Sequence, residues 1–497
     1  MVIVALLTSA TWADDKPTAA VPELPARVET RHTINLAGPS AAHPLDYRAV
    51  AETIGLTDRK GAQVASVYTV SYLVDPPAGQ QRPVAFVFNG GPGAASVFLH
   101  LGAIGPRILE TPATGAVPEP PVHLIDNQST WLRFTDLVFV DPVGTGFSHG
   151  SGKEDNPDKP FWNVHGDLES LGAVVRRWLT RHERWSATVF LVGESYGGLR
   201  AAALAQSLEH DVGVSVSGLV LISPALDVEL LHPDITNALA GAFELPSYAS
   251  AAAVFSGSEA VAETARAAER FGLSDYLVGI AGLKGLPEPG DPFIARIARL
   301  IGLPDEVVRR ARGRVPIQEF VRELRRPHGE VLSRYDATVA RAAGTNPQDD
   351  NAGDPVLDPA VPAYTSAFDT YAPEALGYRT ERPYRVLPRE VSRQWDWDGA
   401  RGGAGGLGLA LSSLERTLLQ HPGTRVLIAN GRYDLVTPYL ASRWLVDQLG
   451  LPEAVRTRIA VRVYEGGHMM YMRPKSRAAL AADAAEIFAP QAAAPPH

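Results

Sequence analysis

The chain has 497 residues, with 46 Lys and Arg against 55 Asp and Glu, a formal net charge of −9, and a composition that is 45% hydrophobic and 20% charged. These proportions are ordinary for a globular protein with a large core and exclude a mostly disordered chain, and the acidic balance without a long Lys/Arg run argues against a nucleic-acid partner. Cysteine is absent, which excludes disulfides, thiolate metal sites and a cysteine nucleophile.

The N-terminal residues have the pattern of an export signal. Residues 1–7 (MVIVALL) are apolar, and the small-residue stretch that follows them ends at Ala13, before the polar residues 14–16. This order is typical of a secretory signal peptide and its cleavage site, although a basic n-region is lacking. We therefore interpret 1–13 as a truncated signal peptide, with a buried first strand as the alternative, and 14–26 as a Pro/Ala linker. The expected location is periplasmic or secreted, and no membrane span is expected because no run approaches ~18 apolar residues.

Short apolar runs bounded by Gly, Pro and Asp predict a series of strands. These runs lie at 33–36, 64–74, 84–88, 137–140, 189–192, 219–222, 425–429 and 461–464. Uninterrupted apolar runs are typical of strands buried on both faces of a mostly parallel sheet. Between them, 165–183 has apolar residues at three- and four-residue spacing, which predicts a helix. The alternation predicts an α/β fold with helices on both faces of the sheet, formed by 27–227 and 411–488, and a disordered tail at 489–497.

The intervening residues 228–410 break this rhythm. They are Ala-rich and helical in pattern at 250–270 and 296–325, and rich in Pro, Gly and Asp from 346 to 362. Few strands are expected there. We interpret this segment as a helical lid or cap inserted into the sheet domain, and not as an independently folding module.

Several short patterns in the insertion resemble binding motifs but lack the neighbouring residues or elements that such motifs require. Residues 403–408 spell G-x-G-x-x-G, but no apolar strand precedes them, so a flexible loop before a helix at 407–420 is predicted in place of a nucleotide site. Trp395 and Trp397 are expected to pack within the insertion, with a substrate cleft as the alternative. Residues 349–351 lack the remaining spacing of a calcium loop. No cofactor and no metal site are therefore expected.

A nucleophile candidate follows the predicted strand at 189–192. Gly193-Glu194-Ser195-Tyr196-Gly197 is a G-x-S-x-G pattern between that strand and a helical sequence. Glycines two residues on either side of the serine permit the strained turn that lifts its hydroxyl off the sheet, and the N–H groups of the following helix favour negative charge there. A purely structural turn is the alternative. Serine becomes nucleophilic only when a histidine takes its proton and a carboxylate orients that histidine.

Two downstream residues supply these partners in the chain order expected for this arrangement, serine first and histidine last. Asp434 follows the predicted strand at 425–429, and His468 lies on a Gly-rich loop after the strand at 461–464. Both positions are where an open α/β sheet gathers its functional groups. Ser195, Asp434 and His468 are therefore the predicted catalytic triad. Other histidines lie within or at the ends of predicted helices and are interpreted as surface or structural residues, among them His100, His165, His182 and His421.

A glycine cluster supplies the oxyanion candidates. The predicted strand at 84–88 runs into Asn89-Gly90-Gly91-Pro92-Gly93. Backbone N–H groups in such a loop, together with the N–H of the residue after the nucleophile, hold the oxyanion in enzymes of this type. Gly91 and Tyr196 are the predicted donors, and a plain Gly/Pro turn is the alternative.

Five blocks in order then resemble the serine carboxypeptidases, peptidase S10, of the α/β-hydrolase superfamily. They are FNGGPGAAS (88–96), LVFVDPVGTGFS (137–148), VGESYGG (192–198), ANGRYDLVTP (429–438) and GGHMMY (466–471). The resemblance implies an α/β-hydrolase fold and hydrolysis of the C-terminal peptide bond through an acyl-enzyme. It also implies that the substrates are peptides with a free C-terminus.

The resemblance extends to substrate-binding residues. It implies that Asn89, Gly90 and Glu194 bind the substrate's terminal carboxylate and that Met469 lines the leaving-group pocket. Two carboxyl groups bind each other only when they share a proton, so binding should favour acidic pH. One departure is Ala103, which stands where the family has a second Glu.

Further departures leave alternatives open. Ala94 replaces a family cysteine, as in a disulfide-free bacterial branch, and Arg107 and Arg432 are alternative positive charges for a carboxylate. Without the second Glu, an esterase or acyltransferase of the same fold is the first alternative to a carboxypeptidase. An inactive binding protein on the same fold is the second.

Overall fold

The computed structural model describes residues 24–37, 43–77, 79–231, 237–282, 285–344, 353–397 and 408–490. The predicted signal peptide, most of the linker, most of the tail, the candidate calcium loop at 349–351 and the glycines at 403–406 lie outside these residues.

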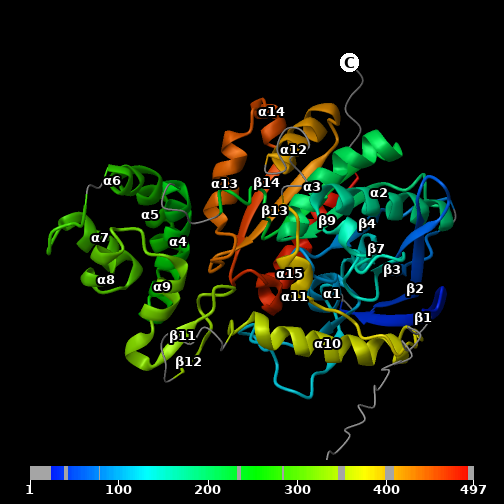
Figure 1. Cartoon of the computed structure of the whole chain (residues 1–497), viewed down its shortest axis with the longest axis horizontal. Coiled ribbons are helices and arrows are strands. Elements are labelled where there is room, and N and C mark those ends of the chain that lie inside the picture. The colour runs from blue at the N-terminus through cyan, green and yellow to red at the C-terminus, as the bar shows by residue number, and fades with distance from the viewer. Residues whose placement is uncertain are drawn as a thin grey trace, which may run out of the picture.

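A ten-stranded mixed sheet forms the centre of the described chain, in the order β1-β2-β3-β7-β4-β9-β10-β13-β14, with β8 beside β3 (Figure 1). From β7 to β14 all neighbours are parallel, and β1, β2, β3 and β7 pair antiparallel. The strands are β1 (Arg27–Leu36), β2 (His43–Thr57), β3 (Gln63–Leu73), β4 (Val84–Phe88), β7 (Asp136–Val140), β8 (His149–Gly150), β9 (Val189–Glu194), β10 (Val216–Ile222), β13 (Arg425–Gly431) and β14 (Ile459–Tyr464). A separate hairpin consists of β5 (Arg107–Leu109) and β6 (Leu124–Asp126).

Helices cover both faces of this sheet. One face packs on α2 (Val164–Arg181), α3 (Tyr196–Ser207) and α12 (Leu409–Gln420), and the other on α1 (Val97–Leu99), α10 (Leu357–Glu374) and α15 (Pro474–Phe488). The short α11 (Arg389–Arg393), α13 (Tyr439–Gln448) and α14 (Glu453–Arg456) complete this part. Central strands such as β4 and β9 are buried along their whole length, which explains their uninterrupted apolar sequences.

The inserted residues contribute to several hydrophobic cores. The cap body consists of α4 (Ala238–Phe255), α5 (Val261–Phe271), α6 (Leu277–Gly282), α7 (Pro292–Ile301), α8 (Asp305–Arg310), α9 (Ile317–Glu323), β11 (Glu330–Leu332) and β12 (Ala340–Ala342). It has its own hydrophobic core and stands at the left of Figure 1, beside the sheet. In contrast, α10 and α11 run along the sheet body, where Tyr364 and Phe368 of α10 join the main core.

Among the described helices, α4 is long and apolar enough to cross a membrane by length and composition. No such segment was expected from the sequence. Two thirds of the apolar window of α4 is buried inside the protein, against α5, α7 and α13. Core helices of soluble proteins have the same composition, so this feature is weak evidence for a span.

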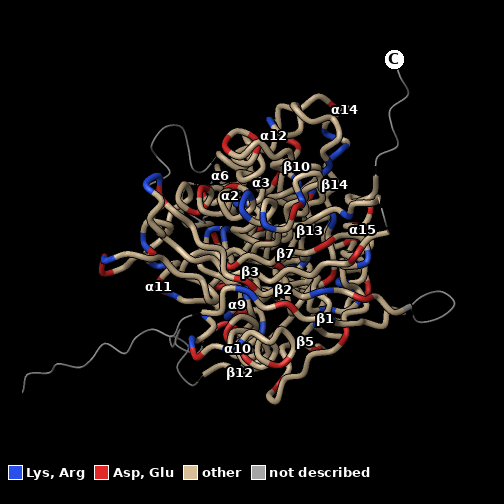
Figure 2. The backbone as a smooth tube through the Cα atoms, turned by 90° about the vertical axis from the view of Figure 1, so that its right-hand side faces the viewer, with Lys and Arg blue, Asp and Glu red and all other residues tan. Residues whose placement is uncertain are grey.

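The charged residues are interspersed. In Figure 2, Lys and Arg positions alternate with Asp and Glu positions over the tube. Many form local pairs, such as Arg184 with Asp136 at 2.6 Å and Arg309 with Glu306 at 2.8 Å.

The α/β-hydrolase fold class predicted from the sequence is confirmed by this sheet and its helices. Each predicted strand is present, and the helix predicted at 165–183 is α2. Several elements were not predicted as such. Among them are β2, whose polar and apolar residues mix because the strand lies near the sheet edge, and α10, which contains Pro362 and Pro373.

Candidate active site

Ser195 occupies a strained turn between β9 and α3. Its φ and ψ are 59° and −125°, a conformation that L-residues rarely adopt. A Cβ at Gly193 would collide with the carbonyl oxygen of Gly197, so glycine is required for this turn to close. The Ser195 N–H donates to the Ile222 carbonyl at 2.9 Å, which fixes the turn to β10. The serine side chain is partly exposed at the carboxyl edge of the sheet.

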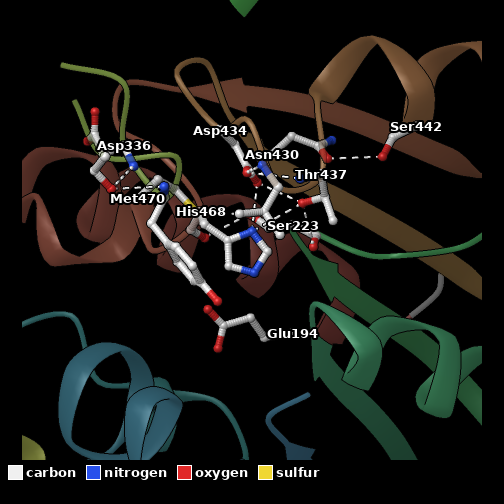
Figure 3. Close-up of polar contacts among 12 residues, drawn as sticks. Glu194, Ser223, Asp336, Asn430, Asp434, Thr437, Ser442, His468 and Met470 are labelled. Atoms are coloured by element: carbon white, nitrogen blue, oxygen red, sulfur yellow. Dashed lines mark hydrogen bonds and ion pairs between the residues drawn. The ribbon is translucent and has the colours of Figure 1, made fainter. Parts of the chain in front are cut away.

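Asp434 and His468 form a buried pair at the same edge of the sheet (Figure 3). His468 Nδ1 donates to Asp434 Oδ2 at 2.8 Å. The N–H groups of Val436 and Thr437 donate to Asp434 Oδ1 at 2.7 and 2.9 Å, and the Thr437 hydroxyl donates to Oδ2 at 2.7 Å. These donors orient the carboxylate toward the imidazole. Ser223 Oγ also donates to the His468 carbonyl at 2.8 Å.

The pKa of His468 reflects opposing influences. Burial lowers it, but the charge and hydrogen bond of Asp434 and the charge of Glu194 outweigh burial, so the pKa of His468 is raised above its usual value. In Figure 3 the imidazole lies between Asp434 on one side and Glu194 on the other. The arrangement stabilises an imidazolium, which is the charge that a general base acquires when it takes a proton.

The glycine loop after β4 lies directly against the serine turn. A Cβ at Gly90 would be 2.6 Å from the Tyr196 nitrogen and 2.6 Å from the Glu194 carbonyl oxygen. Gly91, the next residue, has a φ of 97° and is exposed. The two predicted oxyanion donors, Gly91 and Tyr196, therefore come from backbones in close approach.

The Tyr196 side chain points into the protein. Its hydroxyl donates to Asp167 at 3.3 Å, and Arg200 donates to the same carboxylate at 2.7 Å. Trp395 and Trp397 pack edge-on against the Tyr196 ring, at centroid distances of 5.2 and 5.7 Å. These tryptophans thus brace the residue next to the nucleophile.

Glu194 is a buried carboxyl with two hydrogen-bond donors. Asn89 Nδ2 donates to Oε2, and the Tyr471 hydroxyl donates to Oε1 at 2.8 Å. Burial raises the pKa of Glu194 to about 7, while His468 and Tyr471 act in the opposite direction. Burial also raises the pKa of Tyr471 well above its usual value, so its hydroxyl keeps its proton.

The place of the family's second Glu is apolar here. Ala103 is fully buried in the turn at 100–104. Tyr364 and Tyr471 pack against that turn, since a Cβ at neighbouring Gly102 would collide with the Tyr364 hydroxyl and stand 3.2 Å from the Tyr471 ring. From the region of this turn, the side chain that contacts Glu194 is therefore Tyr471, and no second carboxyl of the described residues stands there. The sequence analysis missed this role, although Tyr471 closes the quoted block 466–471 and lies three residues after His468.

Both residues that flank Asp434 are anchored in the cap body. Tyr433 and Leu435 are buried in its hydrophobic core. The Ala337 N–H donates to the Tyr433 carbonyl and the Leu435 N–H donates to the Arg334 carbonyl, each at 3.0 Å. The 333–338 loop, between β11 and β12, thus holds the Asp434 loop through its backbone.

The same loop holds the histidine. The His468 N–H donates to the Tyr335 carbonyl at 2.5 Å, and the Tyr335 ring stands edge-on to the imidazole at 5.2 Å. A Cβ at Gly467 would collide with the Tyr335 carbonyl and with Asp336. Glycine is therefore required before the histidine, because the inserted 333–338 loop contacts it. No local pattern in the sequence predicts this contact.

The remaining substrate-binding candidates, Met469, Arg107 and Arg432, have the following surroundings. Met469 is 7% exposed and belongs to the main core, and its predicted place in a leaving-group pocket stays a prediction. Arg107 pairs with Asp126 at 2.6 Å and Arg432 with Glu465 at 3.0 Å, so each has a carboxylate partner within the protein.

The remaining histidines have structural settings. His100 is buried beside the Tyr72 hydroxyl at 2.6 Å, and burial lowers its pKa to about 3. His182 lies 2.6 Å from Glu52 at the end of α2. Within the described residues, no group of three or more His, Cys, Asp or Glu could hold a metal ion.

Comparisons with known proteins find sequence similarity to one family. The family model of the serine carboxypeptidases (Peptidase S10) matches residues 71–232. Serine carboxypeptidase-like 13 of Arabidopsis thaliana is 25% identical over 195 residues, 38% of this chain and 43% of that protein. Serine carboxypeptidase-like 2 of the same organism is 26% identical over 198 residues, 38% and 42% of the two chains. The matched part thus spans less than half the length of these relatives.

Among solved structures, proline iminopeptidase of Mycobacterium smegmatis is similar over 88% of this chain and 98% of its own, at 15% identity and a TM-score of 0.36. The strand order and the strained serine turn, more than this loose overlap, define the fold. The five sequence blocks and the family-model match over 71–232 make this part of the chain similar to the serine carboxypeptidases, peptidase S10.

Proposed function

We propose that the protein is a serine carboxypeptidase that removes C-terminal residues from peptides through Ser195, His468 and Asp434. The observation that carries this proposal is the buried Asp434–His468 pair, at 2.8 Å, on loops at the edge of the sheet where the strained turn presents Ser195. A nucleophile, a base and a carboxylate that orients the base are the minimum set for acyl transfer by serine.

In this mechanism Ser195 Oγ attacks the last peptide carbonyl and His468 takes its proton. The N–H groups of Gly91 and Tyr196 stabilise the oxyanion. His468 then protonates the leaving amine, and water releases the acyl group from the serine by the reverse sequence. Asp434 keeps the imidazole oriented and stabilises its positive charge throughout.

Glu194 and Asn89 are proposed to bind the terminal carboxylate, with Gly90 beside them. A pKa of about 7 supports this role, because Glu194 then carries a proton at acidic pH and can share it with a substrate carboxylate. Above neutral pH an ionised Glu194 repels the substrate. Binding of free-acid peptides should therefore weaken as the pH rises past 7.

The second candidate is an esterase or acyltransferase on the same fold. The specific observation in its favour is the fully buried Ala103 in place of the family's second Glu, so that Glu194 is held by Asn89 and Tyr471 without a second carboxyl. An inactive binding protein is less favoured, because all three triad residues are present. For location, we propose a periplasmic or secreted enzyme on the signal-like residues 1–13, which lie outside the described residues.

The test compares one N-blocked peptide with a free C-terminus and the same peptide amidated, at pH 5 and pH 7, with products followed by mass spectrometry. Stepwise loss from the free acid alone supports a carboxypeptidase with a working carboxylate site. Hydrolysis of a small ester with neither peptide cleaved refutes the carboxypeptidase and favours the esterase.

Replacing Ser195 with Ala should abolish turnover and fluorophosphonate labelling while leaving the circular dichroism spectrum unchanged. Ser392→Ala, at an exposed serine of α11, is the matched control and should keep both. Activity retained in the Ser195 variant would exclude it as the nucleophile.

A further inference from the structure

The 333–338 loop carries an arginine that is separated from the catalytic imidazole by one aromatic ring. Arg334 is exposed, and its backbone is fixed on both sides: its N–H donates to Asp354 at 2.9 Å and its carbonyl accepts from Leu435. Its guanidinium carbon lies 6.0 Å from the centroid of the Tyr335 ring. That ring stands 5.2 Å from the His468 imidazole. Arginine, tyrosine and catalytic histidine thus follow one another in space.

Other arginines near the triad are already paired. Arg473 donates to Asp336 at 3.0 Å, Arg432 to Glu465 at 3.0 Å and Arg200 to the buried Asp167 at 2.7 Å. The guanidinium of Arg334, in contrast, has no ion pair or hydrogen bond with any carboxylate in the described part of the chain.

The charge of Arg334 reaches the reaction centre. Burial is the main influence that lowers the pKa of His468, and Arg334 adds to it. Arg334 likewise lowers the pKa of Tyr335, against a larger rise from burial. A cation whose charge acts on the imidazole also attracts a negatively charged substrate group bound beside that imidazole.

We propose that Arg334 is a specificity-determining residue that pairs with a carboxylate of the substrate, so that the site favours acidic substrates. This inference rests on the proposed acyl-transfer function of the same site. The carboxylate has two possible sources, an acidic side chain near the cleaved bond or the C-terminus itself. Arginine is suited to either, because its planar donors match both oxygens of a carboxylate.

The experiment uses N-blocked peptides with Glu or Gln at the last or the next-to-last position. Two activated esters are added, one with a carboxylate on the acyl group and one neutral analogue of the same length. The kcat/KM values are measured for the wild type, Arg334→Gln, Arg334→Glu and the control Arg299→Gln. Arg299 is an exposed arginine on α7 of the cap body, and α7 is labelled at the left of Figure 1.

If an acidic side chain is the source, the wild type should prefer Glu over Gln by about five- to tenfold at one of the two positions, as expected for a partly exposed charge pair. Arg334→Gln should remove that preference and Arg334→Glu should reverse it. Arg299→Gln should behave as the wild type. If the C-terminus is the source, Arg334→Gln should raise KM about equally for all free-acid peptides, relative to the neutral ester.

The inference would be overturned if Arg334→Gln left the acidic-to-neutral ratios of peptides and esters unchanged and also left the KM of free-acid peptides unchanged relative to the neutral ester. The esters separate this outcome from failure of the proposed function. If no peptide is cleaved, the carboxypeptidase proposal fails, but the ratio of acidic to neutral ester still decides the role of Arg334.

Discussion

Replacing Glu194 with Gln should make the stability of the protein less sensitive to pH. Glu194 is 4% exposed, next to the nucleophile, and receives hydrogen bonds from Asn89 and Tyr471. Its pKa rises from 4.5 to about 7 because burial disfavours the charged form. Glutamine has nearly the same shape and stays uncharged at every pH, so it copies the protonated carboxyl.

The sign of the effect follows from linkage. A carboxyl whose pKa is raised by folding binds its proton more tightly in the folded state, so its contribution to stability is complete below pH 4.5 and is lost as the pH rises to about 7. A shift from 4.5 to about 7 corresponds to about 3 kcal/mol in the free energy of unfolding. The advantage of Glu194→Gln over the wild type should therefore grow by about 3 kcal/mol between pH 4 and pH 8.

Urea unfolding followed by tryptophan fluorescence measures this difference, since Trp131 and Trp178 are buried in the main sheet body. A changed hydrogen bond alters the free energy of unfolding by the same amount, about 1 kcal/mol, at every pH. The pH dependence of the difference is therefore the diagnostic quantity. Glu154→Gln, at an exposed glutamate, is the control and should show no trend. A difference for Glu194→Gln that is the same at pH 4 and pH 8 would refute the reasoning. In the activity assay, the same variant should lose the rise of KM above pH 7.

Three further changes test the site. Asp434→Asn removes the charge that stabilises the His468 imidazolium and should lower kcat on the order of 10⁴-fold with little change in KM; a loss below tenfold would contradict the proposed pair. Tyr471→Phe removes a donor that lowers the pKa of Glu194, so the pH at which KM for free-acid peptides rises should move upward, and a profile that is unmoved or shifted downward would speak against this contact. Gly467→Ala forces its Cβ against the Tyr335 carbonyl of the 333–338 loop. This variant should lower the free energy of unfolding by about 1–3 kcal/mol and should also lower kcat. A fully active, equally stable variant would show that this contact is not tight.

The parts of the site that lie on sheet edges were predictable from local sequence. Ser195, Asp434 and His468 each follow an apolar strand, and parallel strands bring their carboxyl ends to one edge. Gly193 is required within the turn itself, because its Cβ would meet the carbonyl oxygen of Gly197. In these cases short-range chemistry determines the geometry, so the pattern could be recognised without knowledge of the packing.

The contacts that cross between distant segments were not predictable in this way. Tyr471 donates to a carboxyl 277 residues away, and Tyr335 approaches His468 from the insertion. The long helix α10 was missed because its internal prolines disfavour a helix locally, while burial of Tyr364 and Phe368 in the main core stabilises it. Tertiary packing decides such features, and a single sequence does not display it.

The backbone bonds between the 333–338 loop and the two triad loops divide the catalytic machinery between two bodies. Ser195 belongs to the sheet, while Asp434 and His468 are held partly by the cap body through Tyr335, Arg334 and Ala337. Disorder in the cap would therefore release the base and leave the nucleophile in place. Partial unfolding of the cap by heat or urea, or a protease cut within it, should abolish activity while the sheet remains folded. A foreign cap grafted onto this sheet would have to supply the same backbone contacts to the Asp434 and His468 loops, so the cap and these loops are expected to change together.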